Sequence, residues 1–206
     1  MGNPLLEFSP SRKSGTSEQA TMFFSKARKW KKVGDAVLAE VQPLVTLTER
    51  QTGKRIGVLS GDDYILGFIT GLSAITAKRV GANLSEEDSG TILFLVLDQI
   101  YGKGVIDRKR LGDLLNGIPQ PNPEFTRGFE CAGKIQVLLY GRHTLYDDPD
   151  YQQALDAVRR GAGHTLNLVA YSSTEDGNVA ALLLNQYFLQ PVLQKLERPE
   201  REAGKH

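Results

Sequence analysis

Apolar residues recur every three or four positions along most of this chain, a spacing that lines one face of an α-helix. The pattern is clearest in segments 62–81, 85–101, 122–140 and 179–196. Amphipathic segments of this length bury their apolar sides against one another around a shared core. The sequence therefore predicts a mostly α-helical fold, arranged as a single-domain multi-helix bundle.

Residues that cap helices stand in front of these segments. Ser85 followed by Asp88 matches a capping box in which aspartate replaces glutamate. The acidic residues 86–88 fill a first turn, where the exposed amides and the helix dipole favour negative charge. A cap residue followed by proline recurs at 122–123 and 148–149. The acidic run therefore predicts a helix start and not a metal or acid–base site.

The first helix is expected from Thr16 or Ser17 to about Val33. Gly34 then breaks the pattern, and Pro43 must end or kink a second helix that begins after it. Two interruptions are therefore expected in the first third of the chain.

The choice between helix and strand stays open in other stretches. In residues 45–59 apolar residues alternate with threonines and Gly53 offers a turn, so a small β-hairpin fits as well as a helix. Short apolar runs that fit buried strands lie near 92–97, 134–140 and 164–171. If those runs were strands, the protein would be an α/β protein with a parallel sheet.

The two ends of the chain differ from its middle. Residues 1–15 are rich in Ser, Pro and Gly, and residues 197–206 are charged and lack large apolar side chains. Both segments are expected to be disordered, with the helical domain between residues 16 and 196. The first fifteen residues lack the apolar centre of a secretory signal. The uncharged run 64–77 is shorter than the roughly twenty residues of a membrane span.

The charge of the chain is unevenly distributed. The net charge is +1, but residues 1–34 hold seven basic and two acidic residues, so the remainder carries −4. The single cysteine, Cys131, excludes an intramolecular disulfide and a cysteine-rich zinc site. A reducing, cytoplasmic location is therefore expected.

The basic residues concentrate in the segment MFFSKARKWKKVG, residues 22–34. On a helix, Phe23, Ala27 and Trp30 approach one face, and basic residues occupy much of the rest. Such a helix can lie on an anionic membrane surface, hold nucleic-acid phosphate, or dock on its own domain with its lysines in solvent. The candidate partner-binding residues are Lys26, Arg28, Lys29, Trp30, Lys31 and Lys32.

Catalytic and metal-binding motifs are weaker. The chain has no HxxxH, HExxH or CxxC and completes neither GxxxxGK[ST] nor GxGxxG, so no catalytic residue, metal or cofactor is predicted. An alternative site combines His143, Asp147 and His164, the last of which stands among glycines. It would serve an enzyme on an α/β scaffold that acts on a small anionic or phosphorylated substrate.

Residues 141–171, GRHTLYDDPDYQQALDAVRRGAGHTLNLVAY, resemble the second half of cis-prenyltransferases, which place a strand, a helix and a strand in similar order. The Asp-Gly-Asn-Arg-Arg segment with which those enzymes hold diphosphate has no counterpart here. The nearest segment, SGDD at 60–63, lacks the arginines. The chain is therefore not assigned to that family.

These patterns together favour a non-enzymatic helical binding, regulatory or assembly protein. A protein partner or self-association is expected first, because several segments are apolar on more than one side. Contact with anionic lipid or nucleic acid is the further expectation for residues 22–34, and no membrane span is expected.

Overall fold

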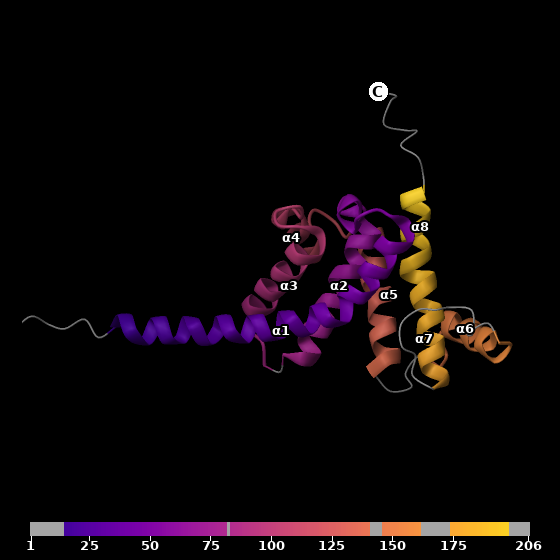
Figure 1. The fold of residues 1–206 in the computed structure, drawn as a ribbon, viewed down its shortest axis with the longest axis horizontal. Coiled ribbons are helices and arrows are strands. Elements are labelled where there is room, and N and C mark those ends of the chain that lie inside the picture. The colour runs from indigo at the N-terminus through magenta and orange to yellow at the C-terminus, as the bar shows by residue number, and fades with distance from the viewer. Residues whose placement is uncertain (1–14, 82, 141–145, 162–173, 198–206) are drawn as a thin grey trace, which may run out of the picture.

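The computed structural model describes residues 15–81, 83–140, 146–161 and 174–197, with side chains from Ser25 onward. The segments expected to be disordered, 1–15 and 197–206, lie outside this part of the chain except for their innermost residues. Within the described ranges the regular elements are helices, which confirms the mostly α-helical bundle (Figure 1). They are α1 (Gly15–Thr52), η1 (Ile56–Leu59), α2 (Asp63–Val80), α3 (Glu86–Tyr101), α4 (Arg108–Asn116), α5 (Pro123–Tyr140), α6 (Pro149–Arg159), α7 (Glu175–Leu184), η3 (Asn185–Leu189) and α8 (Gln190–Glu197).

The predicted strands are wrong wherever the structure describes them. Residues 92–97 belong to α3 and residues 134–140 to α5, whereas 164–171 lie outside the described residues. The expected hairpin at 45–59 is the end of α1 followed by the short 3-10 helix η1. Thr48, one of the threonines that suggested a strand, bonds back along the helix, since its Oγ1 donates to the Leu44 carbonyl at 2.9 Å.

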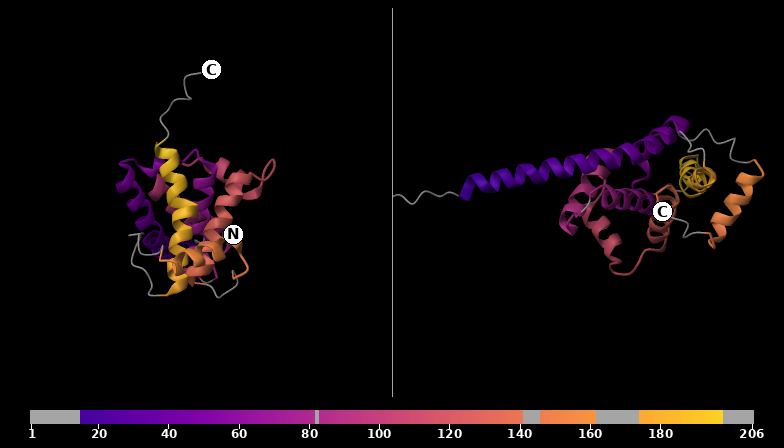
Figure 2. Two further views of the ribbon diagram at one scale, coloured as in Figure 1. Left: turned by 90° about the vertical axis from the view of Figure 1, so that its right-hand side faces the viewer. Right: turned by 90° about the horizontal axis from the view of Figure 1, so that it is seen from below.

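Helix α1 also runs without a break through Gly34 and Pro43, contrary to the expected interruptions. Gly34 is buried with Val96 of α3 beside it. Pro43 is exposed, and so is Ala39, whose carbonyl has no N–H to accept from the proline four residues later. Tertiary packing therefore holds a helix of about 57 Å together. Its first part extends beyond the other helices (Figures 1 and 2).

Helices α2 and α5 form the centre of the bundle and run parallel. Gly67 lies against the backbone of Phe125, and one turn later Gly71 lies against the backbone of Phe129. The GxxxG spacing noted in the sequence thus serves a close helix–helix contact inside the domain. No described helix is long and apolar enough to cross a bilayer.

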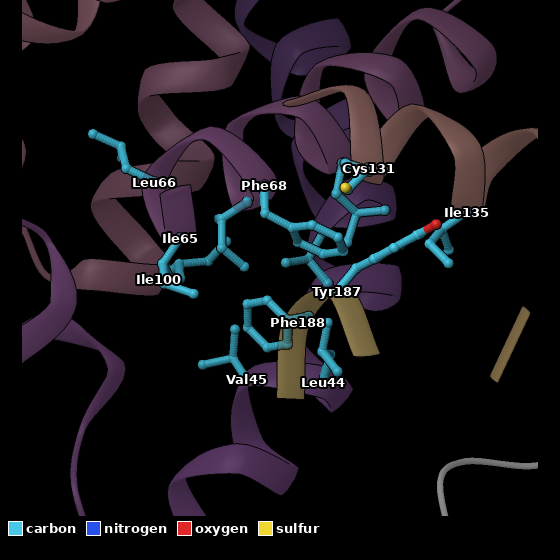
Figure 3. Close-up of a cluster of buried hydrophobic side chains, with 14 of the residues drawn as sticks. Leu44, Val45, Ile65, Leu66, Phe68, Ile100, Cys131, Ile135, Tyr187 and Phe188 are labelled. Carbon is cyan, nitrogen blue, oxygen red and sulfur yellow. The ribbon is translucent and has the colours of Figure 1, made fainter. Parts of the chain in front are cut away.

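Buried aromatic side chains join the last helix to this central pair. The rings of Phe68 in α2 and Phe188 in η3 lie 5.0 Å apart, centroid to centroid, and Tyr187 reaches between α2 and α5 (Figure 3). Pro191 has no N–H to offer the Tyr187 carbonyl four residues earlier, and the Tyr64 hydroxyl donates to that carbonyl at 2.7 Å. A tertiary contact therefore satisfies the backbone where the helix takes its π turn.

Candidate functional site

The candidate site is the basic part of α1 and its junction with the start of α3. We call Lys29, Lys31, Lys32 and Arg28 the basic face of α1, and all four are exposed. At about 100° per residue, Arg28 and Lys32 lie roughly 160° from Trp30 on either side, and Lys29 and Lys31 roughly 100°. The basic face therefore points away from the side of α1 that packs on the bundle.

Trp30 fastens the opposite side of α1 to the domain. Its side chain is half-buried against the core, and its Nε1–H donates to Asp88 Oδ1 at 2.9 Å. Ser85 Oγ accepts the amide N–H of Asp88 at 3.1 Å, as the sequence predicted for the cap of α3. The Asp88 carboxylate, however, accepts the indole hydrogen bond, so it serves a tertiary contact that no sequence pattern indicated.

The basic residues differ in what they contact. Lys26 lies 4.0 Å from Asp88, Lys29 donates to the Asn83 carbonyl at 3.4 Å, and Lys31 pairs with Asp35 at 2.7 Å. Within the described part of the chain, Arg28 and Lys32 make no hydrogen bond or ion pair through their side chains. The pair at the centre of the basic face is therefore the most available to a partner.

The junction holds Asp88 in its ionised form. The hydrogen bond from Trp30 lowers the pKa of Asp88 below its usual value, with further help from the Ser85 hydroxyl and from Lys26 and Lys29. Partial burial of the carboxylate opposes this shift. The carboxylate therefore stays charged beside the basic helix at neutral pH, and the indole keeps a strong acceptor.

The alternative site is only partly visible. His143 and His164 lie outside the described residues, and Asp147 is exposed in the turn before α6. Cys131 is buried between α2 and α5, and burial raises the pKa of its thiol. A buried cysteine with a raised pKa is a poor nucleophile at neutral pH.

A cluster of polar residues that the sequence did not suggest ties α6 to the bundle. Lys134 Nζ lies 2.8 Å from Asp148 and 3.3 Å from Asp150, and the Tyr187 hydroxyl donates to Asp150 at 2.5 Å. Asp148 also caps α6, the one role that the sequence predicted for it. These side chains form hydrogen bonds and ion pairs with one another, so the cluster links the helices and leaves none of them unpaired for a ligand.

No three histidine, cysteine, aspartate or glutamate side chains converge as possible metal ligands among the described residues. A hollow of about 460 Å³ lies between α6 and α7, where Arg159 pairs with Glu175 and Tyr151 donates to Asp176. Asp147 is not part of its described lining.

Comparisons of the chain with protein-family models, with curated proteins and with solved structures found no match.

Proposed function

We propose that this chain is a non-enzymatic helical binding protein that contacts an anionic partner through the basic face of α1. The observation that carries the proposal is the direction of this face. Four exposed cations lie opposite the side on which α1 packs, and two of them make no side-chain contact within the described chain. Clustered positive charge of this kind attracts polyanions even when a protein is nearly neutral overall.

Trp30 has a positioning role in this proposal. Because its indole bonds to Asp88 and packs on the core, it fixes the rotation of α1 about its own axis. That rotation decides which side chains face outward. Lys26, beside Asp88, and Lys31, beside Asp35, are partly neutralised by the domain itself and contribute less than Arg28 and Lys32.

The test reverses the two central charges. The double variant Arg28→Glu and Lys32→Glu keeps the i,i+4 spacing of like charges on α1, and its matched control is Lys103→Glu with Lys109→Glu, two exposed lysines elsewhere. Each cation near an anionic surface contributes about 1 kcal/mol, so the first variant should bind at least about 30-fold more weakly than the native chain. The control should bind as the native chain does.

Binding is measured by co-sedimentation with phosphatidylserine vesicles and by fluorescence anisotropy with labelled nucleic acid, at low and at physiological salt. We expect at least one of these polyanions to bind and to dissociate as salt rises, because screening shortens the reach of surface charges. If none binds at low salt, or if both double variants weaken binding equally, the proposal is wrong.

Self-association is a second candidate, favoured by apolar side chains in and around α3 and α4. Leu95 is 42% exposed, Val105 45% and Ile118 57%, so these apolar side chains lie outside the core and could contact a second copy of the chain. Sedimentation equilibrium across a range of protein concentrations would show a dimer, and a mass that stays monomeric would exclude it. The cytoplasm remains our proposed location, since the one cysteine is buried as a free thiol.

A further inference from the structure

We infer that the anionic partner is duplex DNA in the B form, with the basic face of α1 in the major groove. This inference rests on the proposed function and names the partner class for that same surface. It follows from the shape of the helix, the angular spread of its charges, and the absence of large apolar residues among them.

The outward side of α1 at the basic face has the shape that a groove requires. Trp30 and Val33 pack the opposite side of this segment on the bundle, and the four residues of the basic face are exposed. An α-helix with its side chains is about 10–12 Å across, and the major groove of B-DNA is about 12 Å wide. The outward side can therefore enter the groove while the bundle, packed on the opposite side, stays outside it.

The four charges of the basic face are spread around α1 in a way that fits a groove, whose walls are the two phosphate backbones and whose floor is formed by the base edges. Arg28 and Lys32 lie roughly 20° either side of the direction that points away from Trp30, and Lys29 and Lys31 roughly 80° either side. The four residues lie within about 6 Å along the helix axis. In a groove the outer pair faces the phosphates of the two strands, and the central pair faces the base edges.

A bilayer fits the same face less well. A flat surface meets the central pair, whereas Lys29 and Lys31 would point along it. Helices that lie in a membrane interface turn large apolar residues toward the lipid. From Ser25 to Asp35 the outward side of α1 has none, because Trp30 and Val33 turn toward the bundle. The structure therefore provides electrostatic contact on this side and no apolar insertion.

The experiment compares polyanions of different shape. The full chain is titrated into a labelled 20-base-pair DNA duplex, an RNA duplex and a DNA single strand of the same sequence, and into phosphatidylserine vesicles. The major groove of A-form RNA is too narrow for a helix, so we expect the DNA duplex to bind at least about tenfold more tightly than the RNA duplex. The two cations that face phosphates, Lys29 and Lys31, predict a slope of about −1.8 for log Kobs against log salt concentration.

Charge-neutral variants identify the surface. Lys29→Gln with Lys31→Gln should bring the slope close to zero, and Lys103→Gln with Lys109→Gln should leave it unchanged. A slope that the first pair does not alter would place the DNA on another surface and overturn the inference.

The failure of this inference can be told apart from failure of the proposed function. If vesicles, RNA duplex or single strands bind as tightly as duplex DNA, binding in the major groove is wrong, but the proposal of an anionic partner is not contradicted. Binding to none of the four at low salt would overturn both.

Discussion

Replacing Gly67 by alanine tests the contact on which the core is built. A Cβ at this position would lie 2.9 Å from the Phe125 carbonyl carbon and closer still to its oxygen, whereas ordinary contact begins at 3.4 Å. The Phe125 backbone must therefore recede from α2 by at least half an ångström. A gap of that size costs about a quarter of the dispersion energy of the atoms that it separates.

The magnitude follows from two opposing effects. Overpacking against a neighbour costs about 1–3 kcal/mol, and the upper end applies because the neighbour is backbone and cannot change rotamer. Alanine regains about 1 kcal/mol of helix propensity. Gly67→Ala should therefore lower the free energy of unfolding by about 2 kcal/mol, which is a fall in Tm of about 4–8 °C for a chain of this size.

Gly90 provides the matched control because it also lies inside a helix, α3, and a Cβ built there meets nothing within 4 Å. Gly90→Ala should gain the propensity without the clash and raise Tm by about 2–4 °C. Both variants are followed by circular dichroism at 222 nm during thermal and urea unfolding. Equal melting temperatures would mean that α2 and α5 are not in the close parallel contact described above.

Three further outcomes concern the polar contacts. Tyr64→Phe removes the donor to the buried Tyr187 carbonyl and should lower the free energy of unfolding by about 1–3 kcal/mol in urea melts. The control is Tyr101→Phe, because the buried Tyr101 hydroxyl has no partner in the described structure, and this variant should be as stable as the native chain or more so. Asp88→Ala should shift the emission of Trp30, the single tryptophan, to longer wavelength, and Glu87→Ala in the same turn should not; equal shifts would mean that Asp88 does not hold the indole. Because the pKa of Asp88 is lowered in the folded state, the stability that it contributes is present above its unfolded pKa and is lost as pH falls through the folded value. Trp30 emission should therefore stay constant on acidification until the pH is below the usual aspartate range, and a transition at or above that range would contradict the lowered pKa.

The sequence was sufficient for the helices whose signals are local. Ser85, Asn122 and Asp148 each accept a backbone N–H at the helix start where they were expected as caps. The course of α1 could not be predicted in this way, because Gly34 and Pro43 are helix breakers whose tolerance depends on packing. The residues that decide it belong to α2 and α3, far away in the chain.

The candidate site was partly predictable for the same reason. The charge and spacing of Lys26–Lys32 are local, so the sequence shows an amphipathic basic helix. Which side faces outward depends on a contact between Trp30 and Asp88, 58 positions apart. Asp88 in turn resembles an ordinary first-turn carboxylate, and no pattern around it distinguishes a cap from a tertiary acceptor.

One continuous helix begins at the projecting end, passes along the core and ends beside the last helix, where Lys54 just beyond it donates to the Leu196 carbonyl. A stiff rod of this kind behaves as a lever whose fulcrum is the packed half. A small tilt of the packed half causes a larger displacement of the projecting end. A force on the projecting end in turn acts on the valines that pack the other half of α1 into the core. A partner that binds the projecting end would therefore be mechanically linked to the interior of the domain.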